Sequence, residues 1–289
     1  MKMKKSMLAA GVAAVAMFTA SCRKDVQRQP DEINLPETAI AATQDNLPET
    51  EAPQVKIISN KVGNNVSGYI AGLPARYDAT TKNYPLLIFI HGMGQLANGN
   101  AKLSSVQSLG VTKLLQQQQF PASFTVNGKS HSFIVVSPQF NQYPAASDVN
   151  ELIDYLVQNY RVDAGRIYVA GLNMGGAAAW DIAGAQSDKI AAIVPIAAPS
   201  WADEKRCSNI ASKGVGVWAF HNTDDKVVPS TISKQIVDKI NSLQPATAAR
   251  LTLLPSAEHD AWTKATDPNY KENGMNIYEW MLQFSKSAR

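Results

Sequence analysis

The chain has 289 residues, of which 45% are hydrophobic and 18% charged, and its formal net charge is +3. This composition is sufficient for one globular domain with a sizeable core. The 27 basic residues exceed the 24 acidic ones only through Lys2, Lys4 and Lys5. The remainder is balanced in charge, which excludes a nucleic-acid-binding footprint and a polybasic membrane patch.

The first residues have the pattern of a targeting segment. Three lysines precede the apolar stretch Met7–Ala20, which is too short to span a bilayer. The sequence Thr-Ala-Ser-Cys22 that follows resembles the lipobox of bacterial lipoproteins, whose cysteine is lipidated. An ordinary secretory signal and a retained anchor are the alternatives. We predict a lipoprotein signal peptide over residues 1–21 and an extracytoplasmic protein, anchored at the outer membrane or cell surface by acyl chains on Cys22.

Residues 22–54 are polar and rich in Pro, Glu, Gln and Thr, so they are predicted to form a disordered tether. The folded domain is predicted over residues 55–289. If Cys22 is lipidated, Cys207 is left as a single thiol, and the domain depends on its core and not on a disulfide.

Within this domain, strands are predicted to alternate with helices. Tyr84–Ile90 is a continuous apolar run, typical of a buried central strand. Ser147 is a candidate cap for a helix in which apolar residues recur at i, i+3, i+4 and i+7. Other strands are expected at 55–59, 68–73, 132–137, 167–170, 190–197, 214–220 and 249–254, a hairpin at 124–131, and helices at 103–119, 229–243 and 276–285. This alternation predicts an α/β fold, with a largely parallel sheet covered by helices on both faces.

A tight turn follows the strand at 167–170. Gly171-Leu-Asn-Met-Gly175 has the spacing of the G-x-S-x-G nucleophile elbow, but Asn173 stands at its centre. The elbow residue adopts positive φ, which Asn tolerates better than other residues with a Cβ. The turn is therefore expected to form, although a carboxamide has no hydroxyl to act as nucleophile.

Polar residues follow two later strands. His221-x3-Asp225-x3-Pro229 follows one strand, and Glu258-His259-Asp-Ala-Trp262 follows the next. Together with position 173 they have the order nucleophile, acid, histidine, in which a base activates the nucleophile and a carboxylate orients the base. A metal site is not expected, because His-x3-Asp lies in a loop.

These motifs, with the His91-Gly-Met-Gly turn after 84–90, resemble the secreted esterase branch of the α/β-hydrolases. That branch includes poly(3-hydroxybutyrate)-depolymerase-like, feruloyl- and acetyl-xylan-esterase-like and "predicted peptidase" proteins. The resemblance implies an α/β-hydrolase fold and no cofactor; the short span from position 173 to the acid leaves no room for a lid domain. It also implies that His259 is the general base and that Asp225 is the triad acid, with Asp224 as the competing candidate. The backbone amides of Met93 and Met174 would form the oxyanion hole. Trp201 and Trp262 are candidate walls of the substrate site. The loop at 199–213, which holds Trp201, is expected to be the sole insertion.

The expected function is hydrolysis of carboxylic esters, small or attached to a polymer, with Asn173 in place of the nucleophilic serine. Four interpretations of Asn173 stay open: the chemistry is lost while ligand binding is kept; activity persists by a route the sequence does not reveal; the residue is an introduced or accidental change from Ser; or it deamidates to Asp. The alternative functions are a non-catalytic module that binds a glycan or acyl ligand at the cell surface, and a peptidase.

Overall fold

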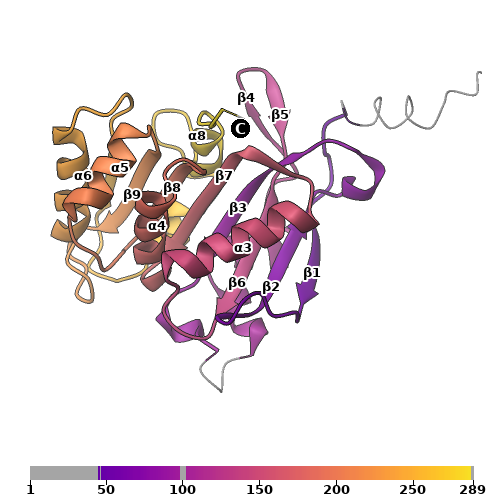
Figure 1. Ribbon diagram of the computed structural model, residues 1–289, viewed down its shortest axis with the longest axis horizontal. Coiled ribbons are helices and arrows are strands. Elements are labelled where there is room, and N and C mark those ends of the chain that lie inside the picture. Colours follow the sequence, from indigo (N-terminus) through magenta and orange to yellow (C-terminus); the bar gives the residue numbers. More distant parts are fainter. Residues whose placement is uncertain (1–44, 46, 98–101, 288–289) are drawn as a thin grey trace, which may run out of the picture. The chain divides into compact units, whose positions relative to one another are not determined.

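The computed structural model describes residues 45, 47–97 and 102–287. Within these residues, one sheet contains the strands β1 (Gln54–Ile58), β2 (Val66–Leu73), β3 (Tyr84–Ile90), β6 (Ile134–Phe140), β7 (Val162–Leu172), β8 (Ile190–Ile196), β9 (Gly216–Asn222) and β10 (Arg250–Leu254). Their order across the sheet is β1-β2-β6-β3-β7-β8-β9-β10 (Figure 1). β2 is antiparallel to both of its neighbours, and all other pairs are parallel. The predicted, mostly parallel sheet is thus confirmed.

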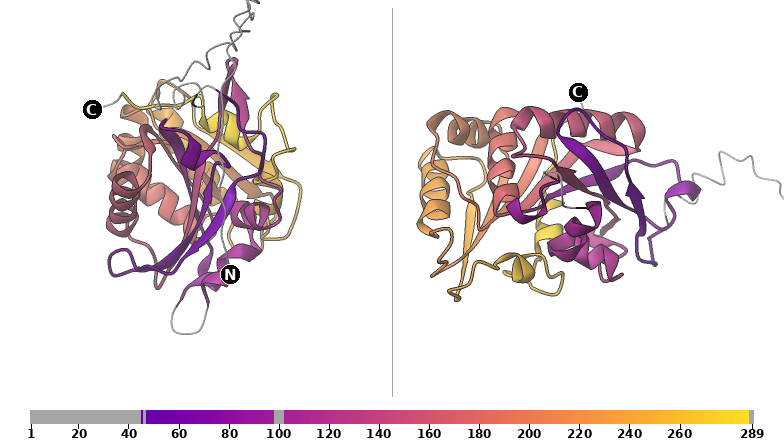
Figure 2. Two further views of the ribbon diagram at one scale, coloured as in Figure 1. Left: turned by 90° about the vertical axis from the view of Figure 1, so that its right-hand side faces the viewer. Right: turned by 90° about the horizontal axis from the view of Figure 1, so that it is seen from below.

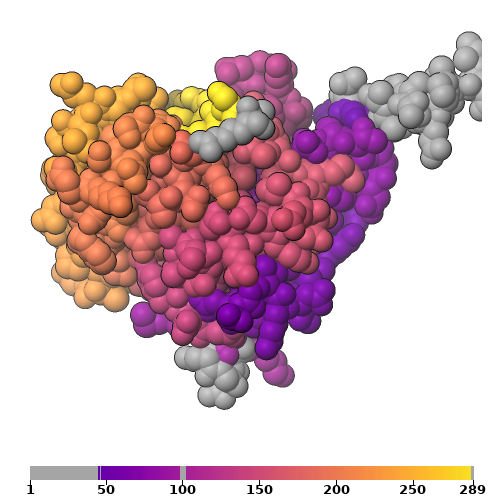
Figure 3. All heavy atoms as spheres, in the orientation of Figure 1, coloured from indigo at the N-terminus to yellow at the C-terminus, as the bar shows by residue number. Residues whose placement is uncertain are grey.

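Helices cover both faces of this sheet, as the edge-on view shows (Figure 2). One hydrophobic cluster joins the sheet to α3 (Ala146–Asn159), α4 (Met174–Ala185), α5 (Glu204–Ser212) and α6 (Thr231–Ser242). The other joins it to α2 (Gly110–Gln116), α7 (Trp262–Ala265), α8 (Ile277–Met281) and the hairpin strand β4 (Phe124–Val126), which pairs with β5 (Lys129–His131). Figure 3 shows the face on which side chains of α3, α5 and α6 cover the strands.

The central strand β3 explains why the run at 84–90 is apolar throughout. Leu86, Ile88 and Ile90 belong to the cluster under α3 and α4, whereas Leu87 and Phe89 belong to the opposite cluster. Side chains alternate between the two faces of a strand, so a strand buried on both faces needs an unbroken apolar sequence. β3 lies between β6 and β7, and the residue that follows it therefore lies next to the end of β7.

Several element boundaries differ from the prediction. Ser147 does not cap α3; the N-cap is Ala145, whose amide donates to Asp148 Oδ2 at 2.9 Å. The segment at 103–119, for which the sequence also allowed a break at Gly110, is divided there into a 3-10 helix, η3 (Leu103–Ser108), and α2, because Gly110 has φ +52°. The closing helix α8 is shorter than expected and is capped by Asn276. The segment at 199–213, predicted to be an inserted loop, contains α5, whose Asp203 cap accepts from the Arg206 amide at 2.8 Å.

The domain begins earlier than the predicted boundary at residue 55. Asp45 accepts hydrogen bonds from the Thr81 amide and hydroxyl, each at 2.6 Å. Glu49 is buried and accepts from the Arg76 amide at 2.9 Å. These contacts attach the end of the predicted tether to the domain. The predicted signal peptide, the lipidation site Cys22 and tether residues 22–44 lie outside the described residues, within which no helix is long and apolar enough to cross a membrane.

Candidate active site

Asn173 lies at a sharp turn between β7 and α4. Its backbone has φ 50° and ψ −117°, a region in which residues with a Cβ are strained. Two backbone hydrogen bonds hold this turn. The Asn173 backbone amide donates to the Ile196 carbonyl at 2.9 Å, and the Asn173 backbone carbonyl accepts from the Ala177 amide at 3.1 Å. The side chain is therefore presented at the carboxyl edge of the sheet, where parallel sheets bind their ligands.

The two glycines that flank Asn173 allow the helix to approach the sheet closely. A Cβ at Gly171 would lie 2.4 Å from the Gly175 carbonyl carbon, and one at Gly175 would lie 2.1 Å from the Ile90 carbonyl oxygen. Neither distance is possible for a real Cβ, so any other residue would push α4 away from β3 and β7. The glycine spacing thus has a packing cause that is independent of the residue between them.

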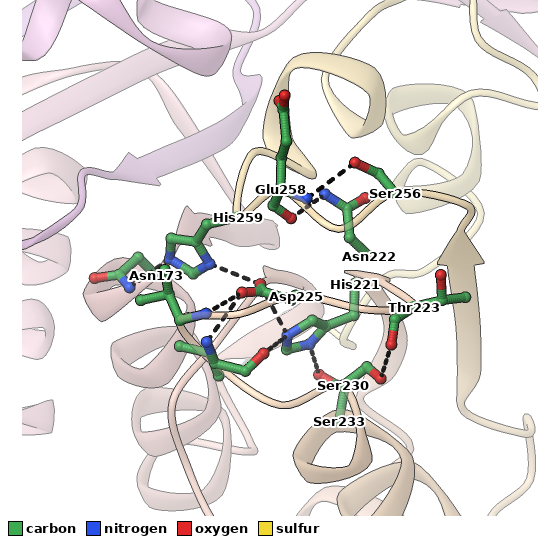
Figure 4. A network of polar contacts seen from close by, with 12 residues as sticks. Asn173, His221, Asn222, Thr223, Asp225, Ser230, Ser233, Ser256, Glu258 and His259 are labelled. Atoms are coloured by element: carbon green, nitrogen blue, oxygen red, sulfur yellow. Dashed lines mark hydrogen bonds and ion pairs between the residues drawn. The ribbon is translucent and has the colours of Figure 1, made fainter.

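His259 and Asp225 complete a chain of hydrogen bonds that begins at Asn173 (Figure 4). The Asn173 Nδ2 atom is 2.8 Å from His259 Nε2, and His259 Nδ1 is 2.7 Å from Asp225 Oδ2. The amide donates to Nε2, so Nδ1 carries the proton and donates to the carboxylate. His259 is thus held as the neutral tautomer that a general base requires.

Asp225 is buried and bonded at both oxygens. Its Oδ1 accepts from the amides of Val227 at 2.8 Å and Val228 at 3.0 Å. Burial alone raises the pKa of this carboxyl, but the hydrogen bonds from His259 and from the two amides outweigh burial and hold the pKa below its ordinary value. The carboxylate is therefore ionised and fixed in orientation. Asp224, the competing candidate, is exposed and does not contact His259; its amide donates to the Ser256 carbonyl at 3.0 Å.

A second histidine lies behind the carboxylate. His221 Nε2 is 2.9 Å from the Val228 carbonyl and 3.4 Å from Asp225 Oδ2, and its Nδ1 is 2.7 Å from Ser233 Oγ (Figure 4). Burial lowers the pKa of His221, so the ring is neutral and Nε2–H points at these two acceptors. The contact of His221 with Asp225 was not foreseen from the sequence, because only folding brings the loop back over the ring.

The amides of Met93 and Met174 begin two helical turns beside Asn173. Met174 is the first residue of α4, and Met93 is the first of the 3-10 helix η2 (Met93–Gln95). The first amides of a helix have no acceptor within it and are available to an anion. A Cβ on Gly92 would lie 3.6 Å from Asn173 Cβ, so the turn that carries Met93 is adjacent to the elbow.

His91 fixes this turn. Its Nε2 accepts from the Phe140 amide at 3.0 Å, and its Nδ1 is 2.7 Å from the Gly92 carbonyl. The ring is buried, and burial lowers its pKa to about 4. Its side chain therefore positions the turn through contacts with two backbone groups.

The buried His91 is expected to make the domain less stable in acid. An unfolded histidine binds its proton near pH 6.5, whereas folded His91 does so near pH 4. Its contribution to the free energy of unfolding is fully present above pH 6.5 and falls as the pH drops to 4, by about 3 kcal/mol. His91→Gln keeps an acceptor for the Phe140 amide but does not titrate. Between pH 7 and pH 4.5, urea unfolding should show a smaller decrease in the free energy of unfolding for the variant than for the wild type. Equal decreases would contradict the lowered pKa of His91.

The two candidate substrate walls differ in exposure. Trp201 is 68% exposed in the segment between β8 and α5. Trp262 is half-buried, and its ring meets that of His259 edge-to-face, with centroids 5.3 Å apart. Trp262 therefore supports the His259 ring, and Trp201 is free to contact a ligand.

Neither a metal nor a cofactor is expected at this site. Among the residues that the structure describes, no group of three or more His, Cys, Asp and Glu side chains has the arrangement of a metal site. The expectation from sequence, that the protein requires neither, stays a prediction.

A family model of the phospholipase/carboxylesterase family matches residues 77–268. The chain belongs to this family. A bifunctional acetylxylan esterase/xylanase of Neocallimastix patriciarum is 26% identical over 155 residues, which cover 50% of this chain and only 20% of that protein. Among solved structures, a thermostable esterase is similar with a TM-score of 0.57 and 21% identity, over 82% of this chain and 64% of its own. A mutant feruloyl esterase module from Clostridium thermocellum, complexed with sinapinate, has a TM-score of 0.55 and 17% identity, over 74% and 83% of the two chains.

These comparisons confirm the predicted α/β-hydrolase fold of the esterase branch. No lid is present in the described residues between Asn173 and Asp225, because α4, β8, α5 and β9 alternate there without a helical cap. Asn173 itself is partly exposed at this edge of the sheet.

Proposed function

We propose that the site binds carboxylic esters and is arranged to hydrolyse them by acyl transfer, with Asn173 at the position of the nucleophile. The observation that carries this proposal is the chain of hydrogen bonds from Asn173 through His259 to Asp225, with links of 2.8 and 2.7 Å, at a strand-to-helix turn. A nucleophile, a base and a carboxylate in this order are what acyl transfer requires.

In the proposed mechanism each residue has one role. His259 removes a proton from the nucleophile and returns it to the leaving group, while Asp225 keeps the imidazole in the required tautomer and stabilises it when protonated. The amides of Met93 and Met174 donate to the oxyanion of the tetrahedral intermediate, which typically stabilises it by about 3–4 kcal/mol per donor. A carboxamide at position 173 has no proton that His259 can remove to form a nucleophile.

Asn173 therefore limits turnover. The second candidate function is non-catalytic binding of an ester or a glycan. The side-chain amide of Asn173 already donates to His259 Nε2, which is the acceptor that a serine hydroxyl would use. Comparing wild-type protein with Asn173→Ser on a small nitrophenyl ester tests the proposal. A variant that cleaves peptides faster than esters would instead favour a peptidase.

The substrate is proposed to be an acyl ester, free or attached to a polymer. The family is one of phospholipases and carboxylesterases, and the Neocallimastix relative is described as an acetylxylan esterase. A site without a lid is compatible with an ester on a bulky chain.

We also propose that the protein is a lipoprotein anchored at the cell envelope through Cys22. This rests on the basic and apolar segment before Thr-Ala-Ser-Cys22. When the full chain is expressed in a bacterial host fed labelled palmitate, the wild type should incorporate label and sediment with membranes. Cys22→Ala should do neither. An unlabelled wild type would contradict the lipid anchor.

A further inference from the structure

Exposed apolar side chains lie on both sides of the elbow. In strand order across the sheet, Tyr143 follows β6, Met93 follows β3, Trp201 follows β8 and Val227 follows β9, and all four are exposed. Asn173 follows β7, in the middle of this series. The carboxyl ends of parallel strands meet at one edge, so a ligand lying across this edge would pass both the apolar residues and the elbow.

Trp201 is the most exposed of these side chains, at 68%, and it is held in place by the buried Arg206. The Arg206 guanidinium lies 5.3 Å from the centroid of its ring and also donates to the Trp201 carbonyl and to Ser200 Oγ. Arg206 is itself buried and forms an ion pair of 2.6 Å with Asp181. An exposed indole fixed in this way loses little conformational entropy when a ligand binds to it.

The same ion pair connects Trp201 to Tyr143. The Tyr143 hydroxyl donates to the second oxygen of Asp181 at 2.7 Å. Burial raises the pKa of this hydroxyl, and the Asp181 carboxylate raises it further, so the hydroxyl remains a donor at neutral pH. Two loops that follow different strands are thus fixed to α4 with an exposed aromatic ring on each.

A surface cavity of about 580 Å³ lies beside Trp201. Its polar lining residues are Asp181, Asp203, Lys205, Arg206 and Asn209. Two carboxylates face two cations, so the charges of the lining cancel. The buried Arg206 is already bonded to Asp181, Ser200 and Trp201, so the polar groups left for a ligand are the exposed Lys205 ammonium and the carboxylate and amide oxygens. This balance disfavours an anionic or a cationic ligand and suits a neutral one that carries several hydroxyl groups.

We propose that Trp201 and this cavity form a binding site for neutral sugar residues. A pyranose ring has flat C–H faces of partial positive charge, which pack on the negative face of an indole, and hydroxyl edges that suit the charged and amide groups of the cavity. The inference rests on the proposed function, in that the glycan would carry the ester presented to Asn173. Asp181 is eight residues beyond Asn173, or about 12 Å along α4, so a sugar chain rather than a single sugar would reach from one to the other.

A membrane surface is a poorer fit to these residues. Binding to the bilayer interface needs a contiguous apolar face with an excess of cations. Here the exposed apolar residues are spread over separate loops, and the charges around Trp201 balance.

Titration calorimetry of the full chain with xylohexaose and cellohexaose tests this site. Asn173 is left unchanged. We expect at least one oligosaccharide to bind, Trp201→Ala to weaken its affinity at least about 10-fold, and Trp201→Phe, which keeps an aromatic face, to retain most of it. Leu253→Ala is the matched control, because this apolar side chain is exposed on β10, away from the cavity. Thermal unfolding of each variant checks that the fold is intact.

Three results would overturn the proposal: no binding of either oligosaccharide by the wild type, equal affinity in Trp201→Ala, or Trp201-dependent binding to phosphatidylglycerol vesicles without oligosaccharide binding. The sugar-binding proposal and the proposed esterase function are tested by independent experiments. The oligosaccharides carry no ester and need no turnover, whereas the esterase assay uses a small ester without sugar.

Discussion

Replacing Asn173 by serine is expected to increase hydrolysis of a short-chain nitrophenyl ester by about 10⁴-fold over the wild type. Loss of the nucleophile in one serine protease lowers kcat by about 10⁶. A serine hydroxyl is one bond from Cβ, whereas the amide nitrogen that now reaches His259 is two bonds away, so the hydroxyl would be displaced by roughly 1 Å. Misplacement of that size costs about 10²-fold. The remaining 10⁴ corresponds to about 5.5 kcal/mol of transition-state stabilisation.

The matched control for this gain is Asn173→Ala, which removes the same amide without supplying a hydroxyl and should stay at the wild-type rate. Hydrolysis by the wild type as fast as by Asn173→Ser would refute the proposed role of position 173. Peptide mass spectrometry of the wild type should read Asn at this position; Asp in active protein would instead indicate a carboxylate nucleophile formed by deamidation.

In the Asn173→Ser background, Asp225→Asn is expected to lower kcat by about 10⁴-fold, which returns the rate to that of the parent chain. The corresponding Asp-to-Asn change in a serine protease has this magnitude, because the histidine then adopts the wrong tautomer. Here His259 Nδ1 donates to Asp225 Oδ2 at 2.7 Å, and the carboxylate is fully buried, so no water replaces the lost acceptor.

Asp224→Asn provides a control of the same chemistry one residue away. Asp224 is exposed and makes no contact with His259, so its variant should keep kcat within about twofold. If both variants lost activity equally, the loop as a whole and not the Asp225 carboxylate would be responsible. Equal thermal stability of the two variants would show that the loss is not due to unfolding.

The site around Asn173 shows which features could be predicted from local sequence. The apolar run at 84–90 and the glycine spacing of 171–175 predicted a buried strand and a tight turn, because both are set by the chain's own backbone sterics and periodicity. The choice between Asp224 and Asp225 rested on spacing carried over from similar proteins. The structure separates them physically, since only Asp225 faces into the protein, where His259 and two amides bond it.

Other features depend on contacts between residues far apart in the chain. The attachment of Asp45 to Thr81, the position of His221 behind Asp225, and the buried Arg206 that carries Trp201 have no signature in the neighbouring sequence. α5 was missed for a related reason: its apolar residues are few, and its helix is stabilised by packing against α4 and by the Asp203 cap.

The sequence by itself determined the class of fold, most of the strands and helices and the turn on which Asn173 stands, because hydrophobic period and glycine sterics act over a few residues. Only the tertiary structure decided which polar groups meet. Hydrogen bonds such as Asn173–His259 join positions 86 residues apart, and their geometry follows from how neighbouring strands bring their carboxyl ends to one edge.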